Sequence, residues 1–182
     1  MNNGKAKIDN SLGRLTISIP SKKDWAILLF GTVWLVGWYF GFKSAISSFS
    51  YGGSGNVIID DLMTSWLIGW ASCGLGLMFF LSWGYFGKEI LQISSNTMKF
   101  EKSIFGIGIK KSMALDKTKN FRFEKIDDQK SGGSRWAFWG LGSGKIKFDY
   151  GLKTSSFGLS VDDEEAVYLV NLLKETIEKK NY

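Results

Sequence analysis

The chain has 182 residues, with 23 Lys and Arg against 17 Asp and Glu, which gives a formal net charge of +6 at pH 7. It contains no histidine, so imidazole is excluded as a base, proton shuttle or metal ligand. A single cysteine, Cys73, excludes an internal disulfide and a thiolate cluster for zinc or iron–sulfur. The length allows one modest domain beside any membrane segment.

Two long stretches without a charged residue follow a polar segment of residues 1–24. They are residues 25–42 and residues 62–86. A helix of roughly 17–25 apolar residues crosses the hydrocarbon core of a bilayer, so both stretches are long enough to be spans. Buried core helices are the alternative, but apolar residues on every side, flanked by Lys and Trp, favour the membrane. A cleaved signal peptide would carry a shorter apolar run, so we expect the first span to be retained.

Basic residues near the ends of the stretches predict their orientation. Five precede the first stretch and five follow the second, namely Lys5, Lys7, Arg14, Lys22, Lys23, Lys88, Lys99, Lys102, Lys110 and Lys111. The connecting residues 43–61 carry one Lys and two Asp. Because Lys and Arg stay on the cytoplasmic side, we expect a helical hairpin over residues 25–86 in the cytoplasmic (inner) membrane. Residues 1–24 and 88–182 would then be cytoplasmic, and residues 43–61 would form an external loop.

Small residues recur inside both stretches at the spacing of one helix face. They are Gly37, Gly41, Ser65, Gly69 and Cys73. Small side chains let two helix backbones approach closely in lipid, so they predict either packing of the two spans on each other or docking against another membrane subunit. Neither stretch contains an ionisable Asp, Glu, Lys or Arg. This argues against a proton path, an ion channel or a transporter.

Residues 88–182 alternate apolar and polar residues in several short runs, which predicts antiparallel strands. The runs are residues 89–94, 97–105, 109–115, 120–126, 145–150 and 154–160. A helix should follow, with Asp162 as N-cap and Glu165 completing a capping box. Its apolar stripe consists of Ala166, Leu169, Val170, Leu173 and Ile177.

Strands followed by one C-terminal helix, joined by the phrase "FGLSVDDEEA" over residues 157–166, resemble the bacterial pleckstrin-homology-like (PH-like) domain. Many such domains follow a two-helix membrane hairpin. The resemblance implies an α+β membrane protein, with a transmembrane hairpin and then a PH-like antiparallel β-barrel or sandwich capped by the C-terminal helix. It also implies a membrane-anchored binding or assembly role, and it carries no activity.

No motif in the sequence predicts catalysis. The acidic clusters, Asp127 with Asp128 and residues 162–165, are explained by a solvated loop and by the first turn of a helix. The glycine-rich run at residues 140–145 opens a strand rather than a helix, so it is no phosphate-binding loop. We therefore expect no catalytic residue, no metal site and no cofactor.

One loop is not explained by the strand pattern. Within residues 127–144, flexible Gly and Ser flank Arg135, Trp136, Phe138 and Trp139. These side chains could close the end of a barrel, insert at the membrane interface, or anchor a protein partner. We expect a contact surface for a partner or the membrane here.

Basic residues crowd the first half of the C-terminal segment. Four of them, Lys99, Lys102, Lys110 and Lys111, together with Arg135, form a candidate site for lipid head groups. A plainly solvated face would use the same pattern, and no nucleic-acid reader motif accompanies it. The sequence thus predicts a non-enzymatic adaptor or assembly subunit that binds membrane lipids and a membrane or cytoplasmic protein, with an anionic-lipid sensor as the alternative.

Overall fold

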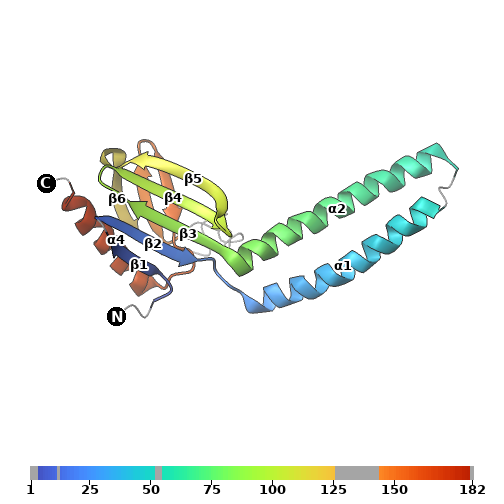
Figure 1. The fold of residues 1–182 in the computed structure, drawn as a ribbon, viewed down its shortest axis with the longest axis horizontal. Helices are drawn as coiled ribbons and strands as arrows, with labels where there is room; N and C mark the ends of the chain where they lie inside the picture. The colour runs from blue at the N-terminus through green and yellow to red at the C-terminus, as the bar shows by residue number, and fades with distance from the viewer. Residues whose placement is uncertain (1–3, 12, 52–54, 126–143, 181–182) are drawn as a thin grey trace. The chain divides into compact units, whose positions relative to one another are not determined.

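The computed structural model describes residues 4–11, 13–51, 55–125 and 144–180. The chain forms two compact units, which Figure 1 draws as a sheet-rich part and a pair of long helices. The first unit contains residues 1–23 and 86–182, and the second contains residues 24–85. We call them the sheet unit and the helical hairpin. The sheet unit is discontinuous in sequence, since the helical hairpin is inserted between its second and third strands.

Five antiparallel strands form the larger sheet in chain order. They are β1 (Lys7–Ser11), β2 (Arg14–Pro20), β3 (Gly87–Ile93), β4 (Thr97–Ile104) and β5 (Ile107–Ala114). The last three correspond to runs expected from the sequence, whereas β1 and β2 were missed. Their signal was present, because Leu15, Ile17 and Ile19 alternate with polar residues and all three are buried. Residues before the first apolar stretch therefore supply two strands of the sheet.

Three antiparallel strands form a second sheet, ordered β6 (Thr118–Phe123), β7 (Ile146–Tyr150) and β8 (Lys153–Phe157). A short 3-10 helix, η1 (Leu115–Lys117), leads from β5 into β6, and β6 pairs with β7 instead of β5. The two sheets are therefore not closed into a barrel, so of the predicted barrel or sandwich the barrel is wrong. After η1 the chain leaves the first sheet, so β6 begins the second sheet and does not pair with β5.

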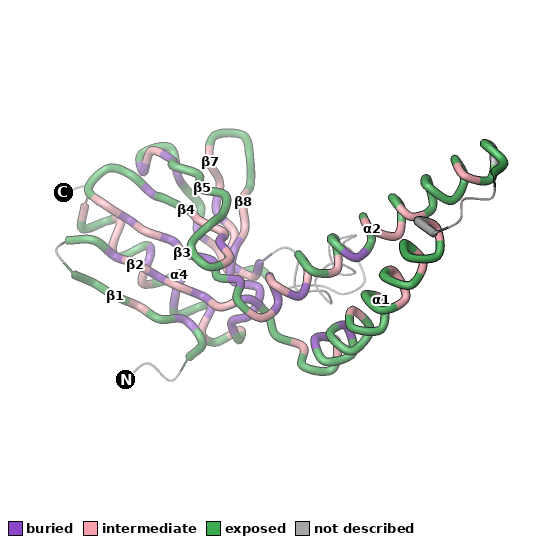
Figure 2. The backbone as a smooth tube through the Cα atoms, turned by 45° about the vertical axis from the view of Figure 1, so that its right-hand side comes forward, coloured by how far each residue is buried: buried purple, intermediate pink, exposed green. Residues whose placement is uncertain are grey.

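Helix α4 (Asp163–Glu178) follows the second sheet as the sequence predicted. Ala166, Leu169, Val170 and Leu173 are buried along one face, and they share a single apolar core with residues of both sheets. Figure 2 shows these buried positions in α4 and along β2 and β3. The sheet unit thus has an apolar core of its own.

The helical hairpin consists of α1 (Trp25–Tyr51) and α2 (Val57–Phe86). Both are long and apolar enough to cross a membrane. Only 11% and 22% of the residues in their most apolar stretches are buried. Each helix extends past its expected span, so much of the expected external loop of residues 43–61 is helical. Residues there, such as Ser47, whose hydroxyl donates to the Lys43 carbonyl, are compatible with continued helix.

Candidate functional site

One end of the sheet unit carries both connections to the helical hairpin. The backbone N–H of Ser21 donates to the Gly87 carbonyl at 2.9 Å, so the chain leaves β2 and enters β3 side by side. Gly87 pairs with Ile104 at the end of β4, and Ile104 pairs with Ile107 at the start of β5. The β4–β5 turn is therefore at this same end of the sheet (Figure 1). We call it the span-proximal end, because it is connected to the two candidate membrane spans α1 and α2.

The β4–β5 turn consists of two residues, Phe105 and Gly106, with φ of 53° and 83°. Positive φ at both central residues defines the type I′ hairpin turn, which favours Asn-Gly or Gly-Gly. A bulky residue in the left-handed region costs about 1–2 kcal/mol. Phe105 occupies this position with 71% of its surface exposed, and its ring lies 4.3 Å from that of Phe86. The turn therefore carries an exposed aromatic side chain at a position where the backbone conformation favours Asn or Gly.

The strand after this turn also exposes apolar side chains. Ile107 and Ile109 are 83% and 71% exposed, although their alternation places them on the same face as buried Met113. Between them, Gly108 lies so close to β4 that an added Cβ would be 1.9 Å from the Lys102 carbonyl oxygen. Beyond Lys111, the core-facing side of β5 therefore presents two uncovered isoleucines, an apolar strip that reaches the span-proximal end.

The four lysines predicted to bind head groups lie on two faces of the sheet. Lys99 and Lys110 alternate to one face, and Lys102 and Lys111 to the other. Lys102 forms a 2.8 Å ion pair with Glu89, and Lys110 lies 3.6 Å from Glu101. The structure therefore does not bring these lysines together as one cluster, and their lipid-binding role stays a prediction.

Glu89 is a buried acidic residue that sequence reasoning did not single out. Besides the Lys102 ion pair, its carboxylate accepts a 2.7 Å hydrogen bond from the Gly158 backbone N–H. Gly158 has φ of 76°, a conformation that favours glycine. The pair ties β3 of the larger sheet to the segment after β8. The sequence contained a signal for the burial of Glu89, because this residue alternates with Leu91 and Ile93 on the inward face of β3.

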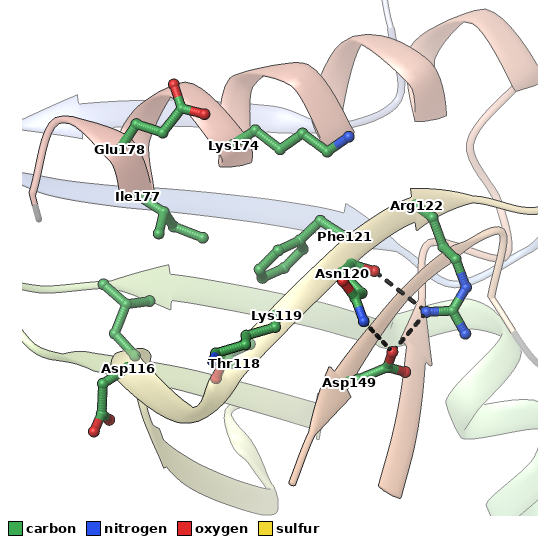
Figure 3. A pocket seen from close by; sticks show the side chains of 11 residues that line it. Asp116, Thr118, Lys119, Asn120, Phe121, Arg122, Asp149, Lys174, Ile177 and Glu178 are labelled. Atoms are coloured by element: carbon green, nitrogen blue, oxygen red, sulfur yellow. Dashed lines mark hydrogen bonds and ion pairs between the residues drawn. The ribbon is translucent and has the colours of Figure 1, made fainter. Parts of the chain in front are cut away.

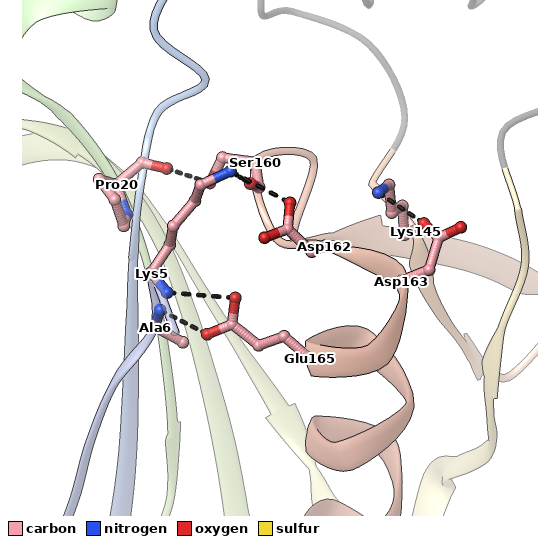
Figure 4. A network of polar contacts seen from close by, with 8 residues as sticks. All are labelled: Lys5, Ala6, Pro20, Lys145, Ser160, Asp162, Asp163 and Glu165. Atoms are coloured by element: carbon pink, nitrogen blue, oxygen red, sulfur yellow. Dashed lines mark hydrogen bonds and ion pairs between the residues drawn. The ribbon is translucent and has the colours of Figure 1, made fainter. Parts of the chain in front are cut away.

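A polar network joins the start of α4 to the N-terminal segment (Figure 4). Glu165 accepts hydrogen bonds from the backbone N–H groups of Lys5 at 3.2 Å and Ala6 at 2.8 Å. Asp162 is the N-cap residue as predicted, but its side chain makes no capping hydrogen bond. The capping-box prediction is wrong in this respect, because Glu165 holds the residues before β1. An added Cβ on Gly4 would lie 2.0 Å from Glu165 Oε1, so the segment passes very close.

A groove of about 830 Å³ in the sheet unit lies between β6, η1 and α4 (Figure 3). Charges of both signs line it, among them Asp116, Asp149, Arg122 and Lys174. Asp149 accepts hydrogen bonds from Thr154 at 2.7 Å, Asn120 at 3.1 Å and Arg122 at 3.0 Å. These bonds lower the pKa of Asp149, so its carboxylate is held ionised.

A general acid needs a raised pKa, but the shifted carboxyl groups of the described residues move the other way. Hydrogen bonds lower the pKa of Asp163 through Lys145, 2.7 Å away, and that of Glu124 through Lys147. The described residues also contain no group of three His, Cys, Asp or Glu side chains that could hold a metal ion. The predicted acidic pair Asp127 and Asp128 lies outside the described residues.

The helical hairpin packs through glycines that face large side chains. An added Cβ on Gly74 would lie 2.1 Å from the Trp38 ring, and one on Gly84 would lie 2.4 Å from Leu28. Of the small residues predicted for helix packing, Gly41 lies under Trp70 at 3.3 Å. Around Gly37 and Gly69 the space is open, and Ser65 and Cys73 are exposed. The hairpin's own close contacts thus use mainly other glycines, which leaves most of the predicted ones facing outward.

An apolar groove of about 410 Å³ surrounds Gly37 on the outside of the hairpin. Its walls are Phe30, Val33, Trp34, Trp38 and Trp70. The indole N–H of Trp38 is buried beside it and has no hydrogen-bond partner among the residues that the structure describes. The helical hairpin therefore carries an open notch next to an unsatisfied donor.

The predicted contact loop with Arg135, Trp136, Phe138 and Trp139 lies outside the described residues. The chain on either side of it is described. The Glu124 N–H donates to the Lys145 carbonyl at 2.9 Å, and Lys145 lies next to Gly158, the partner of Glu89. Both flanks of the loop are therefore at the span-proximal end.

Comparisons of the chain with protein-family models, with curated proteins and with solved structures found no match. The resemblance to bacterial PH-like domains therefore stays a prediction from the sequence.

Proposed function

We propose that the chain is a two-span membrane protein whose termini are cytoplasmic and whose sheet unit is a PH-like binding module. In this role it is a non-enzymatic accessory or assembly subunit, which binds a membrane or cytoplasmic protein through its spans and its cytoplasmic surface. The apolar surface of α1 and α2 supports the membrane part of the proposal, since helices this exposed need a lipid or protein environment.

The groove around Gly37 is the observation that carries the docking proposal. A glycine flanked by large aromatic walls accepts the ridge of another helix, because backbones approach closely where no side chain intervenes. The buried indole N–H of Trp38 adds a chemical requirement. A donor without an acceptor is costly in an apolar environment, so a partner helix with a hydroxyl or carbonyl gains a hydrogen bond if its docking turns the Trp38 ring away from Gly74.

Native mass spectrometry of the intact protein, gently extracted from its own membranes, tests this proposal. We expect a stoichiometric protein partner, and Gly37→Leu should weaken its retention by about tenfold because the side chain fills the groove. Gly76→Leu is the matched control, since Gly76 also faces open space but does not line the groove. A partner retained equally by both variants would exclude the groove as its docking site.

A second variant addresses the cytoplasmic loop. If Trp136→Ala with Trp139→Ala releases the partner while Gly37→Leu does not, the loop is the docking surface. If neither variant releases it, the partner binds elsewhere and both proposed surfaces are wrong. Bare chain with only retained lipid would contradict the adaptor role.

An anionic-lipid sensor is the second candidate, favoured by the exposed amines of Lys99 and Lys111. Neither has a carboxylate within ion-pair distance among the described residues. Because β1 and β2 precede the first helix, a fragment of residues 88–182 would lack two strands, so the full chain must be used. A sensor should retain phosphatidylglycerol over phosphatidylcholine, and Lys99→Gln with Lys111→Gln should abolish that preference. Equal retention of both lipids would contradict it.

A further inference from the structure

The apolar β4–β5 turn is held close to the point where the chain passes into α2. Phe86 is the last residue of α2, and its ring contacts that of Phe105 with centroids 4.3 Å apart. Gly87, the next residue, pairs directly with Ile104, and the Ser21 N–H binds its carbonyl on the other side. The distance from the end of the second span to the turn is therefore set by one strand pair and one ring contact.

From this geometry we infer that the β4–β5 turn inserts Phe105, Ile107 and Ile109 into the interfacial region of the bilayer. The inference rests on the proposed function in one respect, that α1 and α2 cross the membrane. If they do, Phe86 lies at the membrane boundary, and the ring touching it lies at the same depth. An exposed apolar surface that includes Phe gains free energy when it is buried at the boundary between head groups and acyl chains.

The choice of residues in the turn fits a bilayer better than water. A two-residue turn of this type favours Asn or Gly at its first position, yet it carries an exposed Phe. Ile107 and Ile109 extend the same apolar strip, and Gly108 allows the close strand approach that keeps the tip narrow. Lys111 follows on the same face as the two isoleucines, where an exposed basic side chain would meet anionic head groups.

The β7–β8 turn, at the opposite end of the sheet unit, provides a matched control. The β7–β8 turn also has two residues, Gly151 and Leu152, and Leu152 is fully exposed with a relative surface of 106%. The Gly151 N–H donates to the Lys117 carbonyl at 3.4 Å, near the β3–β4 turn rather than the span-proximal end. Both ends of the sheet unit therefore have a two-residue turn with an exposed apolar side chain. Of these two ends, the span-proximal one is connected to α1 and α2.

The test measures depth in nanodiscs of phosphatidylcholine and phosphatidylglycerol with the full chain. A fluorophore is attached to the native Cys73, to Ile107→Cys in a Cys73→Ser background, or to Leu152→Cys in that background. Quenching by lipids with a spin label near the head group, for positions 107 and 152, or near the end of the acyl chain, for Cys73, is compared with quenching by aqueous iodide. We expect lipid quenching at position 107 to exceed that at position 152 by about threefold or more.

Each outcome separates the two proposals. Lipid quenching at Cys73 with none at position 107 would overturn the insertion of the turn and leave the spans in place. A label at Cys73 quenched by iodide alone would overturn both. Shielding of position 107 from both quenchers would show that another part of the protein covers the strip, which also overturns the inference.

A substitution in the β4–β5 turn measures how much Phe105 contributes to insertion. Phe105→Asn suits the type I′ conformation, so the hairpin should stay folded, while the lipid quenching at position 107 should fall by about half. Leu152→Asn should leave it unchanged. Unchanged quenching in Phe105→Asn would mean that Phe105 does not contribute to insertion.

Discussion

The two units of this protein place the same apolar residues in opposite surroundings. In α4 of the sheet unit, Leu169 and Leu173 are completely buried, whereas in α2 Leu62 and Leu75 are about two-thirds exposed. One unit excludes solvent from its own core, and the other presents its apolar residues outward. The comparison teaches that the sheet unit buries its apolar side chains in a core of its own, while the helical hairpin leaves most of its apolar surface uncovered by the described residues.

The same truncation in the two units should give the largest contrast. Leu169→Ala removes atoms from a packed core and should lower the free energy of unfolding by about 2–5 kcal/mol. Leu75→Ala, at a side chain 66% exposed, should change it by less than about 0.5 kcal/mol. Urea denaturation of the detergent-solubilised chain, followed by near-ultraviolet circular dichroism, measures both. Equal losses would show that α2 packs against protein at Leu75.

Glycine substitutions test whether the helical hairpin has any tight packing of its own. Gly74→Ala places a methyl group against the Trp38 ring, so it should destabilise the hairpin by about 1–3 kcal/mol. Gly69→Ala, which points into open space, should be nearly neutral. The fraction of dodecyl sulfate needed for half-unfolding in mixed micelles reports both effects. A neutral Gly74→Ala would mean that Trp38 is not held between the helices.

A third substitution tests whether the residues before the first helix belong to the sheet unit. Glu165→Ala removes the acceptor for the Lys5 and Ala6 N–H groups and should cost about 1–2 kcal/mol. Hydrogen exchange of the β1 amides should accelerate in this variant, but not in Glu164→Ala, the exposed neighbour. Unchanged exchange in β1 would show that the network does not hold the strand.

The smallest effect concerns pH. Hydrogen bonds from Thr154, Asn120 and Arg122 lower the folded-state pKa of Asp149 below its ordinary value of 3.8. Its stabilising contribution is therefore complete above that value and is lost as the pH falls through the lower folded pKa. Asp149→Asn should flatten the acid limb of the unfolding free energy, measured from about pH 6 down to about pH 3, and leave the helical hairpin unaffected. An acid limb identical to that of the unsubstituted chain would contradict this role.

Local patterns predicted most elements of this fold. Period-two alternation indicated β3 to β8, and the stripe from Ala166 to Leu173 indicated α4 together with its buried face. Unbroken apolar sequence indicated two helices long enough to span a membrane. These features depend on neighbours in the chain, so they can be read without knowledge of distant contacts.

Features that depend on distant residues were missed or wrong. Nothing near Glu165 shows that it binds the N-terminal backbone instead of its own helix, because Lys5 and Ala6 are far away in sequence. Likewise, the open sheets follow from β6 pairing with β7, a choice that the residues of β6 alone do not specify. The four lysines look like one cluster in sequence, but strand register divides them between two faces.

By itself, the sequence determined the two apolar helices, the strand-rich segment and the capping position of α4, since each follows from composition or periodicity within one segment. Only the tertiary structure decided that β1 and β2 complete the sheet, and that Phe105 meets Phe86 at the span-proximal end. The physical reason is that strand pairing and ring contacts join residues distant in the chain, and their free energy depends on the whole core.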